Sequence, residues 1–157
     1  MRLFLVHHGE AIGPEVDPQR PLTARGVASC QRLSAACAAR GARPAFIWHS
    51  GKLRARQTAE YFWRACNPLA EFAAVRGLQP GDSPGWMGDR LAGETRDVLL
   101  AGHMPNLPRL LRLLLAGDDQ QTADFPLHGV VALERGDDSS YTEVWRMTED
   151  GEIVAPG

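Results

Sequence analysis

The feature that most constrains the fold is a short apolar run ending in two adjacent histidines, in the sequence LFLVHHGEA at residues 3–11. The run at residues 3–6 lacks polar alternation, which is typical of a strand buried on both faces in a parallel sheet. His7 and His8 then fall at its carboxyl end, with Gly9 permitting a turn too tight for a side chain. Ligands bind at this edge of open α/β sheets, because loops from several strands converge there. The stretch therefore predicts a site at His7 and His8.

The other predicted elements alternate between strands and helices along the chain. Strands are predicted at residues 45–48, 70–76, 98–101, 129–134 and 141–147, the last two as a hairpin. Helices are predicted from the N-cap Thr23 to about Arg40, at 53–66, at 107–115 with Asn106 as cap, and at most one short helix at 86–91. The tail from Thr148 is predicted to be loose. This order predicts a three-layer α/β/α sandwich with a mostly parallel sheet and a C-terminal β-hairpin.

Length and charge narrow the class of protein. A chain of 157 residues is long enough for one domain with a single core. The formal net charge of -2 gives no basic footprint for nucleic acid and no strong field for a membrane. The leucine-rich stretch at 107–116 is broken by Arg109 and Arg112, so it does not predict a membrane span. The first apolar run is also too short for a signal peptide, and we expect a cytoplasmic protein.

The cysteines predict neither a disulfide nor a metal site. Cys30, Cys37 and Cys66 are odd in number and do not have a metal-binding spacing. If Cys30 and Cys37 share the predicted helix, they lie about 10.5 Å apart along its axis, which is beyond disulfide reach. We therefore expect thiols that fill the core.

The histidines gather at predicted strand ends. His7, His8, His49 and His103 follow strands at their carboxyl ends, and His128 precedes one. An isolated histidine in such a place is more often a structural hydrogen-bonding group than a catalyst, and this interpretation is favoured for His49 and His128 taken alone. A random scatter of five histidines would rarely give this arrangement.

Four stretches together resemble a known family. The HHG segment resembles the RHG motif of the histidine phosphatase superfamily, with His7 in place of arginine. RPLTARG from Arg20, SGKLRARQTAE from Ser50 and GHMPNL from Gly102 resemble small phosphohistidine phosphatases of the SixA type. The four stretches occur in the same order as in that family. The resemblance implies a phosphoglycerate mutase-like fold, in one histidine phosphatase domain over residues 1–157.

The resemblance also implies roles for individual residues. His8 matches the nucleophile, Arg54 the phosphate-binding arginine and His103 the second histidine beside the phosphate. A neutral imidazole can attack phosphorus, and cations or N–H donors must then hold the transferred phosphoryl group. Arg20 and Ser50 are further candidates for substrate binding. No metal or organic cofactor is implied.

His7 is the departure from the family motif. An arginine holds phosphate bidentately and is always charged, whereas a histidine offers one good N–H contact and is cationic only near or below a pKa of about 6.5. We therefore expect weaker and more pH-dependent binding, for which Arg20 or Arg56 could compensate. Asp82 is a candidate general acid, although a structural role in a turn is favoured. Glu10 could orient His8 or cap the turn.

The predicted function is hydrolysis of phosphohistidine on a protein, through a covalent phosphohistidine intermediate on His8. The expected partner is a phosphorylated protein of the histidine phosphotransfer type or a small phosphorylated compound, with no nucleic acid or membrane. A phosphatase of small phosphoesters and a catalytically weakened phosphate- or phosphoprotein-binding module are alternatives. A metal hydrolase that uses His7, His8, His49 and His103 is disfavoured, since no HxH or HExxH spacing is present. The sequence does not specify an oligomeric state.

Overall fold

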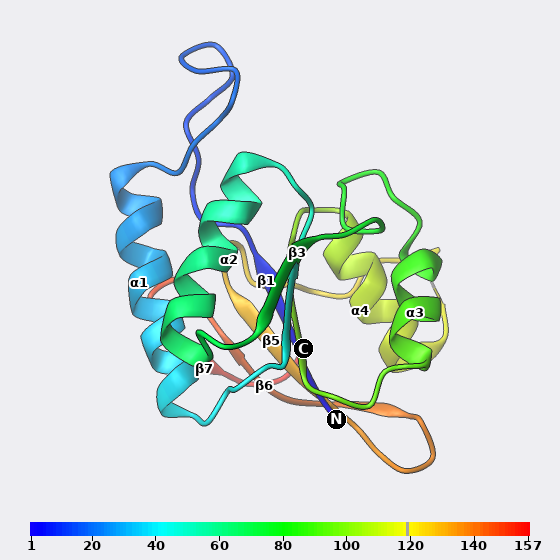
Figure 1. The fold of residues 1–157 in the computed structure, drawn as a ribbon. Helices are drawn as coiled ribbons and strands as arrows, with labels where there is room; N and C mark the ends of the chain where they lie inside the picture. The colour runs from blue at the N-terminus through cyan, green and yellow to red at the C-terminus, as the bar shows by residue number, and fades with distance from the viewer. Residues whose placement is uncertain (119) are drawn as a thin grey trace.

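A seven-stranded mixed sheet forms the middle layer of the protein (Figure 1). In the computed structural model, which describes residues 1–118 and 120–157, the strand order is β3-β2-β4-β1-β5-β6-β7. The strands are β1 (Arg2–His7), β2 (Phe46–His49), β3 (Glu71–Ala74), β4 (Val98–Gly102), β5 (Val130–Arg135), β6 (Tyr141–Met147) and β7 (Ile153–Val154). Pairing is parallel among β3, β2, β4 and β1, and antiparallel from β1 through β5 and β6 to β7. The core strands are thus parallel and β5–β6 form the predicted hairpin.

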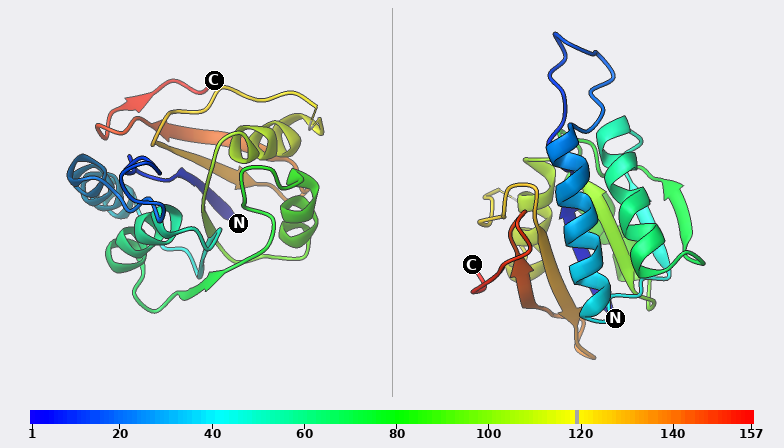
Figure 2. Two further views of the ribbon diagram at one scale, coloured as in Figure 1. Left: turned by 90° about the horizontal axis from the view of Figure 1, so that it is seen from above. Right: turned by 90° about the vertical axis from the view of Figure 1, so that its left-hand side faces the viewer.

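Helices cover both faces of this sheet (Figure 2). Helices α1 (Ala24–Ala39) and α2 (Leu53–Cys66) pack on one face, and α3 (Pro84–Ala92) and α4 (Asn106–Ala116) pack on the other. Each face has its own apolar core, because successive strand residues point to opposite sides. The predicted three-layer α/β/α architecture is confirmed. None of the helices that the structure describes is long and apolar enough to cross a membrane.

Strand β1 lies in the middle of the sheet, between β4 and β5. Phe4 and Val6 belong to the core under α1 and α2, whereas Leu3 and Leu5 belong to the core under α3 and α4. All four side chains are buried, and each such burial stabilises the fold by roughly 1.5–3 kcal/mol. The uninterrupted apolar run therefore predicted a central strand correctly.

Local sequence also predicted the start of α1. Thr23 is its N-cap, and the Thr23 hydroxyl accepts a hydrogen bond from the backbone N–H of Gly26 at 3.0 Å. Cys30, Cys37 and Cys66 are buried free thiols, as expected.

Two predictions at element ends are wrong. Helix α4 begins at Asn106 with Pro105 as its N-cap, because the Asn106 side chain instead donates to the carbonyls of Gly77 and Asp82. The tail is not loose throughout, since β7 pairs with the end of β6 through Met147 and Ile153. Both outcomes depend on contacts with distant residues, which local sequence patterns do not contain.

The topology brings five histidines towards one end of the sheet. β1, β2 and β4 run in the same direction, so the carboxyl ends that bear His8, His49 and His103 lie at one edge. β5 runs the other way beside β1, and its first residue, Val130, pairs with Val6. The segment that enters β5, including His128, therefore lies at the same edge.

Candidate active site

His8 follows β1 and has a defined pattern of hydrogen bonds. Its backbone N–H donates to the Gly102 carbonyl at 3.1 Å, so that the residue remains tied to β4. Its ring Nδ1 lies 2.7 Å from the Gly9 carbonyl. A carbonyl only accepts, so Nδ1 must carry the ring proton and Nε2 is left with the lone pair of the neutral ring. This is the atom that a nucleophilic histidine would use.

The surroundings of His8 keep its ring neutral. Burial lowers its pKa to about 4, opposed by the hydrogen bond to Gly9 and reinforced by the positive charge of Arg54. The Arg54 Nε–H points at His8 Nε2 over 3.4 Å. Arg54 lies in the first turn of α2, where the helix dipole favours an anion. His8 and Arg54 therefore combine an uncharged imidazole with a cation beside it.

Gly9 is required by close packing. A Cβ at this position would lie 2.8 Å from Cys30 Sγ and 3.1 Å from the Gly26 carbonyl oxygen. Gly9 does not have a positive φ, so the expected reason, a turn that only glycine can adopt, is replaced by the approach of α1. A side chain here would push the residue after His8 away from that helix.

His103 lies beside His8 and is bonded to Ser50. The ring centroids of His8 and His103 are 5.0 Å apart, and His103 Nε2 is 2.7 Å from the Ser50 hydroxyl. That hydroxyl also accepts the backbone N–H of Lys52 at 3.2 Å, so its own proton is free to go to His103. Burial, together with the neighbouring charges of His8 and Arg54, lowers the pKa of His103 to about 3. His103 is thus a neutral group, brought next to His8 as predicted.

His7 differs most from its expected state. The backbone N–H of His128 donates to His7 Nδ1 at 2.8 Å, so Nδ1 is unprotonated and the ring proton sits on Nε2. Burial, and then the repulsion that a protonated His8 would exert, lowers the pKa of His7 to about 2. These contacts therefore do not favour the expected cation in place of arginine. His7 is a neutral N–H donor.

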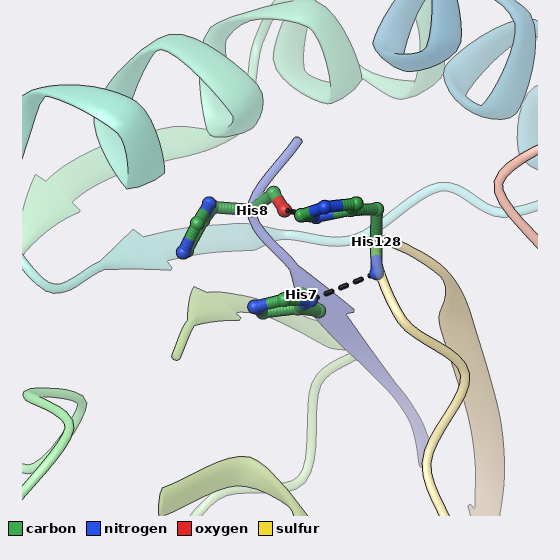
Figure 3. Close-up of side chains that lie close together, drawn as sticks. All are labelled: His7, His8 and His128. Atoms are coloured by element: carbon green, nitrogen blue, oxygen red, sulfur yellow. Dashed lines mark hydrogen bonds between the residues drawn. The ribbon is translucent and has the colours of Figure 1, made fainter. Parts of the chain in front are cut away.

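His128 is a residue of this site that local patterns did not identify. Its ring stacks on His7 with centroids 4.8 Å apart and planes 4° from parallel, and its Nδ1–H donates to the His8 carbonyl at 2.6 Å (Figure 3). The indication in the sequence was its place before an antiparallel strand adjacent to β1. Such a strand starts at the edge where β1 ends.

Arg20 acts on the residues of the site through its positive charge. The positive charge of Arg20 contributes to lowering the pKa of His8, of Arg54 and of His103. Its backbone is left-handed, with φ of 52°, and its Nε–H donates to the Ile12 carbonyl at 3.0 Å. Arg20 therefore adds to the positive field around His8 from the loop between β1 and α1.

Other candidates have structural contacts. Arg56 pairs with Glu60 along the surface of α2, so it does not compensate for the missing arginine. His49 accepts the Gly51 N–H and packs on Phe72. The Asp82 carboxylate accepts the backbone N–H groups of Gly77 and Gln79, as favoured for a turn.

Glu10 belongs to the start of α1. Its carboxylate accepts the Thr23 hydroxyl at 3.0 Å and lies 3.7 Å from Arg25. Of the two roles considered for Glu10, these contacts match capping and not the orientation of His8.

These histidines are poorly suited to bind a metal ion. In the described part of the chain, His7, His8 and His128 each have a ring nitrogen within 4.8 Å of the others, which is a different set from the one considered in the sequence. His7 Nε2 carries a proton and so has no lone pair for a metal. Arg54 points its Nε–H at His8 Nε2, where a cation would have to bind.

Comparison with solved structures identifies the fold. The protein histidine phosphatase SixA in complex with tungstate superposes with a TM-score of 0.82 at 22% identity, over 95% of this chain and 97% of that chain. Alpha-ribazole phosphatase from Shigella flexneri gives 0.70 at 17% identity, over 91% and 94% of the two chains. A phosphoserine phosphatase mutant from Entamoeba histolytica in complex with phosphoserine gives 0.65 at 13%, over 91% and 94%. No protein-family model and no curated protein matches the sequence. The expected phosphoglycerate mutase-like fold is confirmed.

Proposed function

We propose that this chain is a SixA-type member of the histidine phosphatase superfamily that hydrolyses phosphohistidine on a protein. The observation that carries the proposal is the state of His8, which is neutral, has its Nδ1–H held by Gly9 and turns Nε2 towards Arg54. The fold shared with phosphatases of several substrates supports the reaction class. The four motifs in family order support the SixA type.

In the first step, His8 Nε2 attacks the phosphorus atom of the substrate. A P–N bond to His8 forms as the P–N bond to the substrate ring breaks, and that ring, which carries a proton on its other nitrogen, departs as a neutral imidazole. The His8 ring gains positive charge, which the Nδ1–H bond to the Gly9 carbonyl stabilises. Arg54 meets the negative charge on the transferred phosphoryl oxygens.

In the second step, water attacks the phosphorus atom and releases phosphate. The O–P bond forms, the bond from phosphorus to His8 Nε2 breaks, and the ring returns to its neutral state, while the attacking water gives one proton to solvent. Arg54 holds the phosphoryl group in this step as well, since the same oxygens carry the charge. His7, through Nε2–H, and His103 are placed to donate or accept hydrogen bonds around the group.

The charges around the site favour a phosphoramidate substrate over a phosphoester. In the part of the chain that the structure describes, the charged groups acting most strongly on His8 and His103 are Arg54, Arg20, Lys52 and other histidines, and none is a carboxylate. A serine leaving group needs an acid to protonate it, whereas a phosphorylated imidazole that carries a proton on its other nitrogen departs as a neutral ring near neutral pH. A phosphohistidine therefore suits a site without a carboxylic acid.

The covalent intermediate tests the proposal directly. The protein is mixed with a phosphohistidine-containing phosphotransfer protein labelled with ³²P and quenched in alkali, which preserves phosphohistidine. We expect the label on His8 in the wild type and on no residue in His8→Asn. Label on another residue, or turnover by His8→Asn at the wild-type rate, would contradict the nucleophile. A phosphoserine peptide tested in parallel should turn over much more slowly, and faster turnover would favour the phosphoester alternative.

A further inference from the structure

His128 contacts both histidines of the HHG segment. Its backbone N–H donates to His7 Nδ1 at 2.8 Å, and its ring Nδ1–H donates to the His8 carbonyl at 2.6 Å. The next residue continues the contact, since the His7 backbone N–H donates to the Gly129 carbonyl at 3.0 Å. His7 is thus held through its main chain and its ring by two consecutive residues that lie more than 120 positions away in the sequence.

The contact between His128 and His7 decides where the His7 proton lies. An imidazolium carries protons on both nitrogens, so a charged His7 would set its Nδ1–H against the N–H of His128. Only the neutral ring with its proton on Nε2 accepts this hydrogen bond. Figure 3 shows the second ring nitrogen of His7 on the side where the His8 ring lies. The proton is therefore presented to the same space as the nucleophile.

We propose that His128 is a positioning residue, which holds His7 as a neutral Nε2–H donor at the phosphoryl site, where the related motif has a cation. The catalytic role of this arrangement rests on the function proposed above. In this arrangement the phosphoryl site has one directed hydrogen bond from His7 in place of the permanent charge of an arginine. Arg54 and Arg20 supply the positive charge. Binding by His7 then does not depend on its protonation.

The other groups that face His7 also disfavour a second charge. His8, His103, His128 and Arg54 all act to lower its pKa, in addition to burial. No carboxylate is among these neighbours in the described part of the chain. A protonated His7 would therefore have no anionic partner until a phosphoryl group arrived.

The conformation of His128 indicates that its side chain contributes to this arrangement. Its φ of 54° is left-handed, a region that a histidine seldom adopts unless its surroundings compensate. The compensating contacts are the stacked His7 ring and the bond to the His8 carbonyl. Removing the ring should let the backbone relax and release the N–H from His7.

Histidine NMR tests the proposal without reference to turnover. Long-range ¹H–¹⁵N spectra of the full chain, labelled at histidine, distinguish the two neutral tautomers and the imidazolium, and His7→Gln identifies the His7 signals. We expect the Nε2–H tautomer for His7 at every pH from 5.5 to 8.5. A Nδ1–H tautomer, or titration of His7 within this range, would overturn the proposal.

Two variants test the role of the side chain. His128→Ala removes the ring, and His128→Asn tolerates a left-handed backbone and keeps a donor for the His8 carbonyl. In His128→Ala we expect His7 to populate a second tautomer or to titrate, with kcat/KM lower on the order of 10²-fold and a changed pH profile. His128→Asn keeps the left-handed backbone and the donor, so it should retain the wild-type His7 signals better than His128→Ala does. If folded His128→Ala keeps the wild-type His7 signals and pH profile, or if His128→Asn changes them as much as His128→Ala does, the side chain of His128 does not position His7 in this way.

His49→Ala is the matched control, because His49 is another buried strand-end histidine that packs on Phe72. It should leave the His7 signals unchanged. An equal change in His49→Ala would overturn the assignment to His128. Labelling of His8 is a separate measurement, so failure of the proposed function and failure of this inference are distinguishable.

Discussion

The backbone N–H of Gly9 donates to the Thr58 hydroxyl at 3.0 Å, and the same hydroxyl donates to the Arg54 carbonyl at 2.8 Å. Thr58 is buried one turn after Arg54 on α2. One hydroxyl thus connects the residue after His8, the proposed nucleophile, with the helical turn that carries Arg54, the proposed phosphate-binding arginine. The relative position of His8 and Arg54 depends on this connection.

Thr58→Val keeps the shape of the side chain and removes the hydroxyl. The buried Gly9 N–H then lacks its partner, which costs about 1–3 kcal/mol. We expect a lower free energy of unfolding in urea. We also expect kcat/KM to fall by more than the smaller fraction of folded protein explains. Thr58→Ser keeps the hydroxyl and should retain most of the activity. Equal kcat/KM in the valine and serine variants would contradict the connection.

Arg54→Ala should mainly remove stabilisation of the transition state. Other preorganised donors contribute about 3 kcal/mol, so we expect kcat to fall by on the order of 10²-fold. Arg56→Ala is the matched control, since Arg56 pairs with Glu60 two residues further along the same helix. Rate constants for both variants, measured with a phosphohistidine protein, check this. A similar effect in the two variants would mean that charge on α2 matters in general, and that the contact with His8 does not.

The pH dependence of kcat/KM should have an acid limb alone. His8 must be neutral to attack, and burial lowers its pKa to about 4, so the rate rises through that pH. His7 is neutral throughout and adds no alkaline limb, contrary to the bell-shaped profile that a cationic His7 would give. Rates from pH 4 to 9, corrected for the uncatalysed hydrolysis of phosphohistidine in acid, check this. An alkaline limb that disappears in His7→Gln would contradict the neutral state of His7.

Much of the fold could be predicted because its determinants are local. The uninterrupted apolar runs marked β1, β2 and β4 as buried parallel strands, and Thr23 marked the start of α1. His8, Arg54 and His103 were brought together because strand ends and the following helix starts meet at one edge of such a sheet. For these elements, local pattern and tertiary structure agree.

The protonation states could not be predicted in the same way. The tautomer of His7 depends on an N–H that lies 121 residues away, and the neutral state of His8 depends on burial that forms only with the complete fold. β7 likewise forms by pairing with β6, and its two residues have too short a pattern to be read alone. These features arise from contacts between distant segments.

Buried neutral histidines should make the protein sensitive to mild acid. The folded-state pKa values of His7, His8 and His103 are about 2, 4 and 3, below the 6.5 of an unfolded chain. Below pH 6.5 the unfolded chain therefore binds more protons, and stability falls as pH falls, by at most about 1.4 kcal/mol per pH unit for each histidine. Urea unfolding between pH 7 and 5.5 measures this slope. His7→Gln should reduce it by an amount that approaches one proton at pH 5.5, and an unchanged slope would show that His7 titrates in the folded protein as it does in the unfolded chain.

The last prediction concerns exchange of His7 for the arginine of the related motif. Arginine has no acceptor for the His128 N–H, and its longer side chain meets the ring that now stacks on His7. His7→Arg alone should therefore lower both stability and kcat/KM, although it restores a permanent charge and a bidentate donor. His7→Arg combined with His128→Ala frees the space of the ring and gives water access to the N–H. We expect the double variant to exceed His7→Arg in kcat/KM by about tenfold or more, whereas His128→Ala alone lowers it, so that the two substitutions are strongly non-additive. His7→Gln is the neutral control, because its amide oxygen can still accept from His128. If His7→Arg alone keeps wild-type stability and gains activity, then His128 does not occupy the space that an arginine at position 7 requires.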